Sequence, residues 1–276
     1  METTGTTFLR KAWVVLADAF GHFNADDGWA MASHVALSGL MALFPFLIFV
    51  AVFAGSIGEA NLANRVAELI FAAWPEEVAG PIAAEVKRVL MPVHGNLLTV
   101  SALVVAYLAS NGVEAVRTAL NRAYRVVDRR SLILRRIQSL IFVLAGTAMF
   151  LVLAGLAVAA AAAPALPFGA TFAYAGILIT SLLVIIGLVA AHVVLPAARP
   201  PWPKLWPGIV ATLVAWVLSA WVFAFYLQRF SNMVAFYAGL AGIVTAIFFL
   251  YVIAVVMIFG AEFNASLERL RDRRIG

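Results

Sequence analysis

The chain has 276 residues, of which 64% are hydrophobic and 12% are charged, and its net charge is +5. Soluble domains are nearer half apolar and a quarter charged, so this composition excludes an ordinary soluble protein and predicts an all-α, polytopic membrane protein. The absence of cysteine excludes disulfides, thiolate metal sites and cysteine nucleophiles. The positive charge favours cytoplasmic loops that face anionic lipid over a nucleic-acid surface.

Residues 1–30 are predicted to form an N-terminal amphipathic segment that lies on the membrane surface. The apolar residues of one helical face are Leu9, Trp13, Leu16 and Phe20. Lys11 and Asp18 lie on the opposite face. The apolar stretch is too short and too interrupted for a secretory signal.

Six runs are long and apolar enough to cross a bilayer, which takes about 20 residues. They are approximately Met31–Ser56, Val93–Glu114, Ile137–Ala163, Phe168–Leu195, Leu205–Leu227 and Leu240–Phe263. Each should be helical, because hydrocarbon offers no partners to backbone polar groups. Residues 31–266 are thus expected to form a six-helix transmembrane domain. Its second helix should leave the bilayer and continue to about Val127.

The connections between the spans differ in character. Residues 57–92 are predicted to form short amphipathic interfacial helices outside the cytoplasm, and residues 164–167 a tight turn. Residues 115–136 form a basic cytoplasmic connection, and residues 267–276 a basic cytoplasmic tail. The proline-rich stretch at 196–207 should be stiff and non-helical.

The distribution of basic residues predicts the topology. Fifteen Lys and Arg residues fall in the N-terminal segment, the second and fourth connections and the tail, whereas only four fall on the other side. The positive-inside rule therefore places both termini in the cytoplasm. The segment 57–92, with five acidic residues, faces outward.

A polar stripe leaves the second span and is the most informative candidate site. Its members are Asn111, Glu114, Arg117, Asn121 and Arg125. Their spacing of three or four residues puts them on one side of a helix, and Glu114 and Arg117 can pair across one turn. They indicate either a substrate path with arginine donors for an anionic group, or a helix end whose arginines reach the headgroups.

Further candidates for a substrate path lie on other spans. These residues are His34, Ser38, Pro45, Tyr124, Arg229, Tyr237, Glu262 and Asn264. Pro45 should kink the first span, and Glu262 is expected to pair with a loop arginine. The four histidines are scattered, and no carboxylate cluster, phosphate loop or nucleophile elbow is present, so we expect no enzyme activity, no metal and no cofactor.

Three groups of residues resemble a known family. They are ASHVALS at 32–38 with LFP at 43–45, ALNRAY at 119–124, and YAGLAG at 237–242 with GAEFN at 260–264. In this order they resemble the YihY/BrkB family of bacterial inner-membrane proteins. The resemblance implies a six-helix envelope-integrity protein; some members carry an old ribonuclease label, and one branch is linked to lipid export.

Three functions are compatible with these features. The stripe, the kink and the resemblance favour a transporter or flippase-like protein for an anionic or amphiphilic substrate, with lipids as one class. The alternative is an envelope scaffold without transport, and a membrane ribonuclease has less support. We expect membrane lipids, with anionic headgroups at the cytoplasmic face, as partners; a homo-oligomer is left open, and nucleic acid is not expected.

Overall fold

A computed structural model describes residues 4–56, 95–162, 169–197, 202–234 and 240–272 of the chain. This part of the chain forms seven α-helices and one short 3-10 helix. Their bounds are α1 Thr4–Ala25, α2 Gly28–Ser56, α5 Gly95–Ala123, α6 Leu132–Ala162, α7 Gly169–Val194, η2 Trp202–Lys204, α8 Trp206–Val234 and α9 Leu240–Asp272. The expected helices at 57–92 and the expected turn at 164–167 lie outside the described residues.

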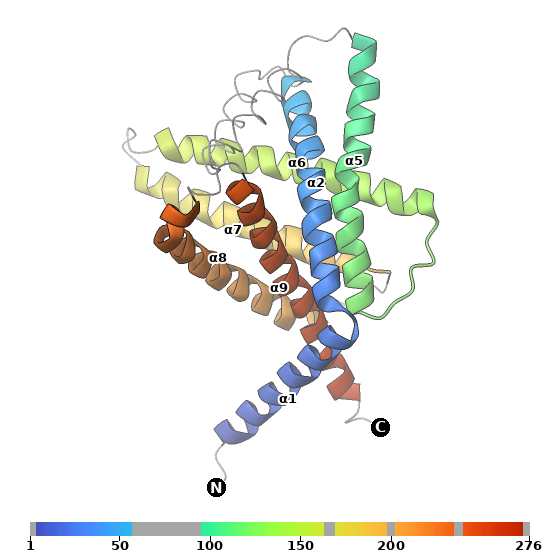
Figure 1. Ribbon diagram of the computed structural model, residues 1–276, viewed down its shortest axis with the longest axis vertical. Coiled ribbons are helices and arrows are strands. Elements are labelled where there is room, and N and C mark those ends of the chain that lie inside the picture. Colours follow the sequence, from blue (N-terminus) through green and yellow to red (C-terminus); the bar gives the residue numbers. More distant parts are fainter. Residues whose placement is uncertain (1–3, 57–94, 163–168, 198–201, 235–239, 273–276) are drawn as a thin grey trace.

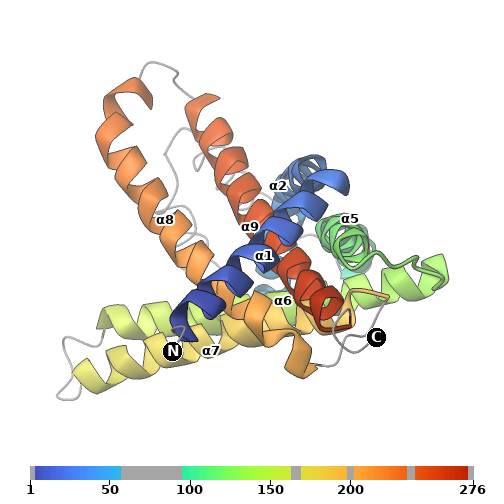
Figure 2. The same ribbon diagram turned by 90° about the horizontal axis from the view of Figure 1, so that it is seen from below.

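The helices are arranged around α2, α5 and α9. Helices α2 and α5 run side by side, and α9 packs against both of them (Figure 1). Helix α1 packs on α9, so the two ends of the chain lie at the same end of the molecule. Seen from below, α6 and α7 form an antiparallel pair, while α8 and α9 converge where α8 begins and α9 ends (Figure 2).

Four helices in the described part of the chain are long and apolar enough to cross a membrane. They are Leu132–Leu153, Tyr174–Val194, Trp206–Tyr226 and Val244–Arg271. They coincide with the third to sixth predicted spans, and a shorter apolar helix covers Gly28–Leu43 in α2. Large apolar side chains on these helices point outward; Trp221, for example, is 77% exposed. The chain is therefore a polytopic, all-helical membrane protein.

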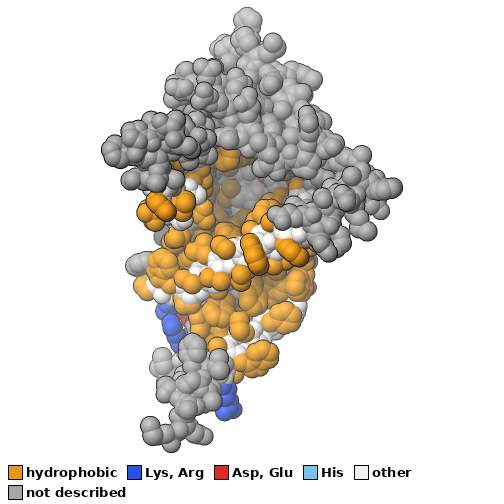
Figure 3. All heavy atoms as spheres, turned by 90° about the vertical axis from the view of Figure 1, so that its left-hand side faces the viewer, with side chains coloured by type: hydrophobic (Ala, Val, Ile, Leu, Met, Phe, Trp, Pro, Cys, Tyr) orange, Lys and Arg blue, Asp and Glu red, His pale blue; other side chains and the backbone are white. Residues whose placement is uncertain are grey.

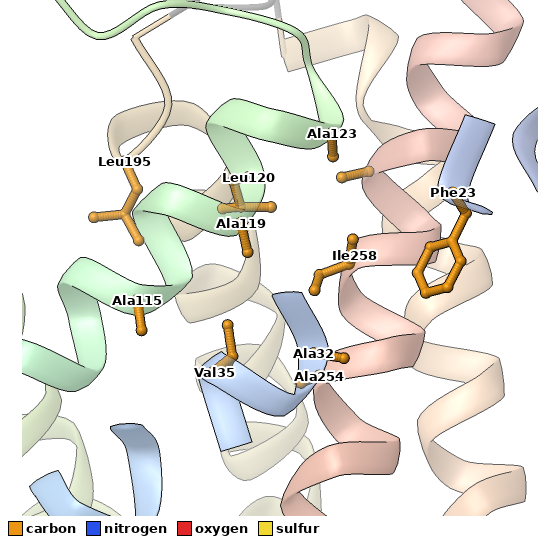
Figure 4. Close-up of a cluster of buried hydrophobic side chains, with 11 residues drawn as sticks. Phe23, Ala32, Val35, Ala115, Ala119, Leu120, Ala123, Leu195, Ala254 and Ile258 are labelled. Atoms are coloured by element: carbon orange, nitrogen blue, oxygen red, sulfur yellow. The ribbon is translucent and has the colours of Figure 1, made fainter. Parts of the chain in front are cut away.

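A cluster of small apolar side chains holds the central helices together (Figure 4). Ala32 of α2, Ala115 and Ala119 of α5, and Ala254 of α9 are each at most 2% exposed. Alanine lets helix backbones approach closely, which is the usual way in which helices associate in lipid. Phe23 of α1 closes the cluster at one end and packs edge-on against Trp29.

Helix α5 ends at Ala123, four residues before the end that the sequence predicted. Arg125 has a φ of 53°, in the left-handed region, which stops the helix. The N–H of Val126 donates to the carbonyl of Asn121, and the N–H of Arg125 to that of Arg122. These two bonds make a Schellman motif in which arginine occupies the position that glycine usually fills. At the other end of the chain, α9 continues to Asp272, so the first part of the expected tail is helical.

Candidate functional site

The polar stripe on α5 contains the ion pair that its spacing predicted. Arg117 is 1% exposed and donates to Glu114 on the preceding turn. Ser139 of α6 donates a 3.2 Å hydrogen bond to the Glu114 carboxylate, and the Arg135 guanidinium lies 3.7 Å from it. Arg117 is therefore sheltered inside the bundle and does not extend toward headgroups.

Arg117 keeps unused donors. Its Nε and Nη2 atoms are buried and have no hydrogen-bond partner among the described residues. Buried polar groups nearly always have partners, and an unpaired charged donor is unfavourable. Because Glu114 occupies only one nitrogen of this guanidinium, the remaining nitrogens are suited to an anionic group.

A groove of about 410 Å³ opens beside this ion pair, between α5 and α6. It is lined by Tyr107, Glu114, Leu132, Ile133, Arg135, Arg136 and Ile137. Arg136 donates to Ser110 at 2.6 Å and to the exposed side chain of Asn111 at 3.0 Å, and its guanidinium lies 4.1 Å from the centre of the Tyr107 ring. Cationic and apolar groups side by side suit an amphiphilic anion.

Asn121 joins two loops. Its amide nitrogen is 3.3 Å from the carboxylate of Asp128, and its oxygen accepts a 2.7 Å hydrogen bond from the backbone of Ala197. Arg130 binds Asp128 with hydrogen bonds of 2.8 and 2.6 Å, and these bonds lower the pKa of Asp128 to about 2. Arg130 also donates to the carbonyl of Leu195 at 2.6 Å. This cluster ties the end of α5 to the end of α7.

Two turns face each other at the end of α5. Asp27, between α1 and α2, and Arg125, after α5, both have left-handed backbones, with φ values of 52° and 53°. Arg122 pairs with Asp27, and Arg125 donates to Asp26 at 2.6 and 2.9 Å. The ion pairs between the turns hold each of them in its uncommon conformation.

Glu262 lies behind these turns on α9 and is 1% exposed. Its carboxylate is 3.7 Å from Arg125, one of the loop arginines with which a pair was expected, and 3.9 Å from Arg269. Neither carboxylate oxygen has a hydrogen-bond partner among the described residues. Arg269 donates instead to Asp18 of α1 at 2.9 Å.

Asn264 caps a helix. Its side chain accepts a 2.7 Å hydrogen bond from the N–H of Gly208 and donates one of 2.9 Å to the carbonyl of Leu205. A Cβ atom at Gly208 would overlap Asn264 and the carbonyl of Gly260, so glycine is required where α8 and α9 cross. Asn264 thus serves the packing of α8 on α9.

An apolar cavity of about 540 Å³, open on one side, lies among α2, α5, α6, α7, α8 and α9. Its lining includes Gly39 and Leu43 of α2, Val113 and Val116 of α5, and Gly146 of α6. The lining is almost wholly apolar, so the cavity suits hydrocarbon. Val113 and Val116 place it within one helical turn of the buried Arg117.

The remaining sequence candidates among the described residues do not line this cavity. His34 is exposed, and neither it nor Ser38 nor Pro45 contributes to the lining. Pro45 lies inside α2, and Tyr124, just beyond the end of α5, is half-buried and packs against the central cluster. The roles suggested for these residues stay predictions. Arg229 lies on α8 without a described side chain, and Tyr237 lies outside the described residues.

Several residues that form the ion pairs and hydrogen bonds described above were not singled out from the sequence. Asp18 and Asp26 bind arginines that lie about a hundred or more positions away in the chain. Arg130 and Arg136 counted only as cytoplasmic charges, although Arg130 binds the end of α7 and Arg136, on α6, binds α5. A local signal exists only for Asp128, which lies two residues before its partner Arg130.

The comparisons with known proteins agree with this architecture. The family model described as virulence factor BrkB matches residues 19–275. A protein named as ribonuclease-like, YfkH of Bacillus subtilis, is 25% identical over 265 residues, which cover 92% of this chain and 95% of that protein. A UPF0761 membrane protein of Rhodospirillum centenum is 25% identical over 97% of this chain.

The chain spans 60% of the length of the Rhodospirillum protein. No solved structure matches the chain. The family model covers nearly all of the sequence, and it confirms the family that the three sequence motifs indicated. The chain is a polytopic membrane protein that belongs to the BrkB family.

Proposed function

We propose that this protein is a transporter or flippase-like protein that moves an anionic or amphiphilic substrate, with lipids as the leading class, in the bacterial inner membrane. The observation that carries the proposal is the apolar cavity of about 540 Å³ among six helices. A bundle that served only as a scaffold would be expected to fill this space, because helices in lipid are held together by close packing.

The substrate class follows from what lies beside the cavity. The cavity itself accepts hydrocarbon, whereas the neighbouring groove holds Arg135 and Arg136, and Arg117 has unused donors. A molecule with an anionic head and an apolar tail matches both environments. Phosphate and carboxylate heads are equally compatible with these guanidinium groups.

The proposed topology has six spans, with α2 and α5 completing the four long apolar helices. Helices α1 and α9 reach the end of the molecule where both termini lie (Figure 1). Arg122 and Arg125 pair with the α1–α2 turn, and Arg269 of α9 pairs with Asp18 of α1. On the face shown in Figure 3, apolar side chains form a broad band and Lys and Arg side chains lie below it. The positive-inside rule then makes that end cytoplasmic. The outer face of α1, with Trp13 and Phe20 exposed, would rest on the inner leaflet.

The cavity can be tested by filling it. Gly146 lines the cavity and has open space around it, so Gly146→Leu should occupy the cavity without a backbone clash. Gly155 lies on the same helix, also has open space around it and is not among the cavity-lining residues, so Gly155→Leu is the matched control. Gly39→Leu fills the same cavity from α2 and serves as a second variant.

The measurement is exchange of fluorescent phosphatidylglycerol between the leaflets of liposomes that contain the purified protein. We expect exchange with the wild type and with Gly155→Leu, and a rate lower by about tenfold, equivalent to about 1.4 kcal/mol, with Gly146→Leu and Gly39→Leu. Wild-type liposomes that exchange lipid no faster than empty ones would favour the scaffold. Equal rates for all variants would remove the cavity from the path.

A further inference from the structure

The environment of Glu262 is unusual for a carboxylate. Its side chain is buried, and both of its oxygens lack a hydrogen-bond donor among the described residues. The two nearest guanidinium groups, those of Arg125 and Arg269, lie at 3.7 and 3.9 Å, which is beyond hydrogen-bond distance. A buried carboxylate is normally satisfied by several donors.

The missing donors have a clear cause, because two other carboxylates use them. Arg125 donates to Asp26 at 2.6 and 2.9 Å, and Arg269 donates to Asp18 at 2.9 and 3.2 Å. Ser266 also donates to Asp18, at 2.7 Å. Glu262 is therefore the acidic group to which neither arginine donates.

The charges of the groups around Glu262 lead to the same conclusion. The charged and titratable groups that surround Glu262 are Asp18 and His22 of α1, Asp26 of the α1–α2 turn, Tyr124 and Arg125 at the end of α5, and Arg269 of α9. Among the side chains of fixed charge type in this group, three carboxylates face two guanidinium groups. One negative charge is left over, and a single proton on the cluster removes it. Glu262 is the place for that proton, because burial without donors disfavours the ionised form.

We propose that Glu262 is a proton-binding site of the protein, and that it holds a proton while Arg125 and Arg269 are bound to Asp26 and Asp18. If the α1–α2 turn moves away and Asp26 enters water, Arg125 becomes free to pair with Glu262. Glu262 then releases its proton to water and becomes a carboxylate paired with that arginine. Proton binding and the position of the turn are thereby coupled.

This coupling supplies a driving ion for the transport function, and this step rests on the function proposed above. Glu262, Arg125 and Asp26 lie on three separate elements, α9, the end of α5 and the α1–α2 turn. A change in the charge of one residue is thus transmitted to the contact between those elements. The protonation of Glu262 itself does not depend on what the protein transports.

Infrared spectroscopy of the full-length protein in liposomes tests the proton directly. The wild type at neutral pH should show the carbonyl stretch of a protonated carboxylic acid, and Glu262→Gln should lack it. The matched control is Glu268→Gln, on the same helix, because Glu268 is exposed and paired with Lys204; this variant should keep the band. His22→Gln should also keep it. A wild type in which the carbonyl band of the protonated acid is as weak as in Glu262→Gln would overturn the proposal.

Phosphatidylglycerol exchange under a pH gradient tests the coupling. With one coupled proton, the final ratio of phosphatidylglycerol between the two leaflets should change by about tenfold for each pH unit across the membrane in the wild type, and this ratio should not respond in Glu262→Gln. A wild-type lipid distribution that does not change with the pH gradient would refute the coupling between proton binding and lipid exchange. If the wild type exchanges no lipid at all, the transport function fails, and the infrared band still decides whether Glu262 carries a proton.

Discussion

The two halves of the molecule are held together by different forces. At the end near the termini, ion pairs and hydrogen bonds connect α1, α5, α7 and α9, and Arg117 and Glu262 are each 1% exposed there. In the middle of the bundle the contacts are apolar, and a cavity of about 540 Å³ remains open between the helices. The first region is held by directional bonds, although Arg117 and Glu262 keep unpaired atoms there, and the second has unused space.

This difference shows which region can change shape. A network of directional bonds has few alternative arrangements, whereas helices that meet through alanine, glycine and valine can slide over one another at small cost. The polar end should therefore be limited to a few defined pairings, such as the two proposed for Arg125, whereas the middle is the adjustable part. Substitutions in the two regions should differ in their effect on stability accordingly.

The largest effect is expected at Asp128. Its side chain is 7% exposed and that of Arg130 is 17% exposed, so Asp128→Ala leaves a half-buried guanidinium without its carboxylate. Breaking such a pair costs about 3 kcal/mol. Unfolding of the purified protein in mixed micelles would measure the loss. Glu268→Ala, which removes an exposed carboxylate, is the control and should cost less than about 1 kcal/mol.

The same pair predicts a pH dependence. Because Arg130 holds the pKa of Asp128 at about 2, below its ordinary value of 3.8, the stabilisation is complete above pH 3.8 and is lost as the pH falls through 2. The wild type should therefore lose its advantage over Asp128→Ala only in this acidic window. An advantage that disappears already at neutral pH would contradict the ion pair.

A smaller but clear loss is expected where α8 crosses α9. In Gly208→Ala the new methyl group meets the backbone of Gly260 and the side chain of Asn264, neither of which can move far. Overpacking of this kind costs about 2 kcal/mol. The midpoint of thermal unfolding in detergent should fall, and α8 should become more accessible to protease. A variant as stable as the wild type would mean that the two helices do not meet at this glycine.

The sequence alone was sufficient for features that depend on local spacing. Runs of apolar residues predicted the third to sixth spans, and the three-residue spacing of Glu114 and Arg117 predicted their ion pair. Both follow from the geometry of a single helix, which fixes which residues share a face. The family also followed from short motifs in a fixed order.

Features that depend on how helices meet could not be predicted. Asp26 binds Arg125 across 99 positions, and Asn264 caps α8 from α9, yet no local pattern indicates which helices are neighbours. The predicted end of α5 was wrong for a related reason. Arg125 adopts a left-handed backbone that ends the helix, and its ion pair with Asp26, far away in the sequence, supports that conformation. The cavity likewise depends on the separation of six helices, which spacing within one helix does not determine.

The smallest effect should come from a second glycine-to-alanine substitution, Gly39→Ala, in the adjustable middle of the bundle. Gly39 lines the cavity and nothing lies near the position of an added Cβ, so Gly39→Ala has no clash to relieve. Alanine also favours the helix by up to about 1 kcal/mol over glycine. The variant should thus unfold at the same temperature as the wild type or slightly higher, while Gly208→Ala unfolds lower. Opposite effects of the same substitution on the unfolding temperature would distinguish the packed polar end from the open middle. A loss of stability in Gly39→Ala as large as that in Gly208→Ala would mean that the space beside Gly39 is closed in the folded protein.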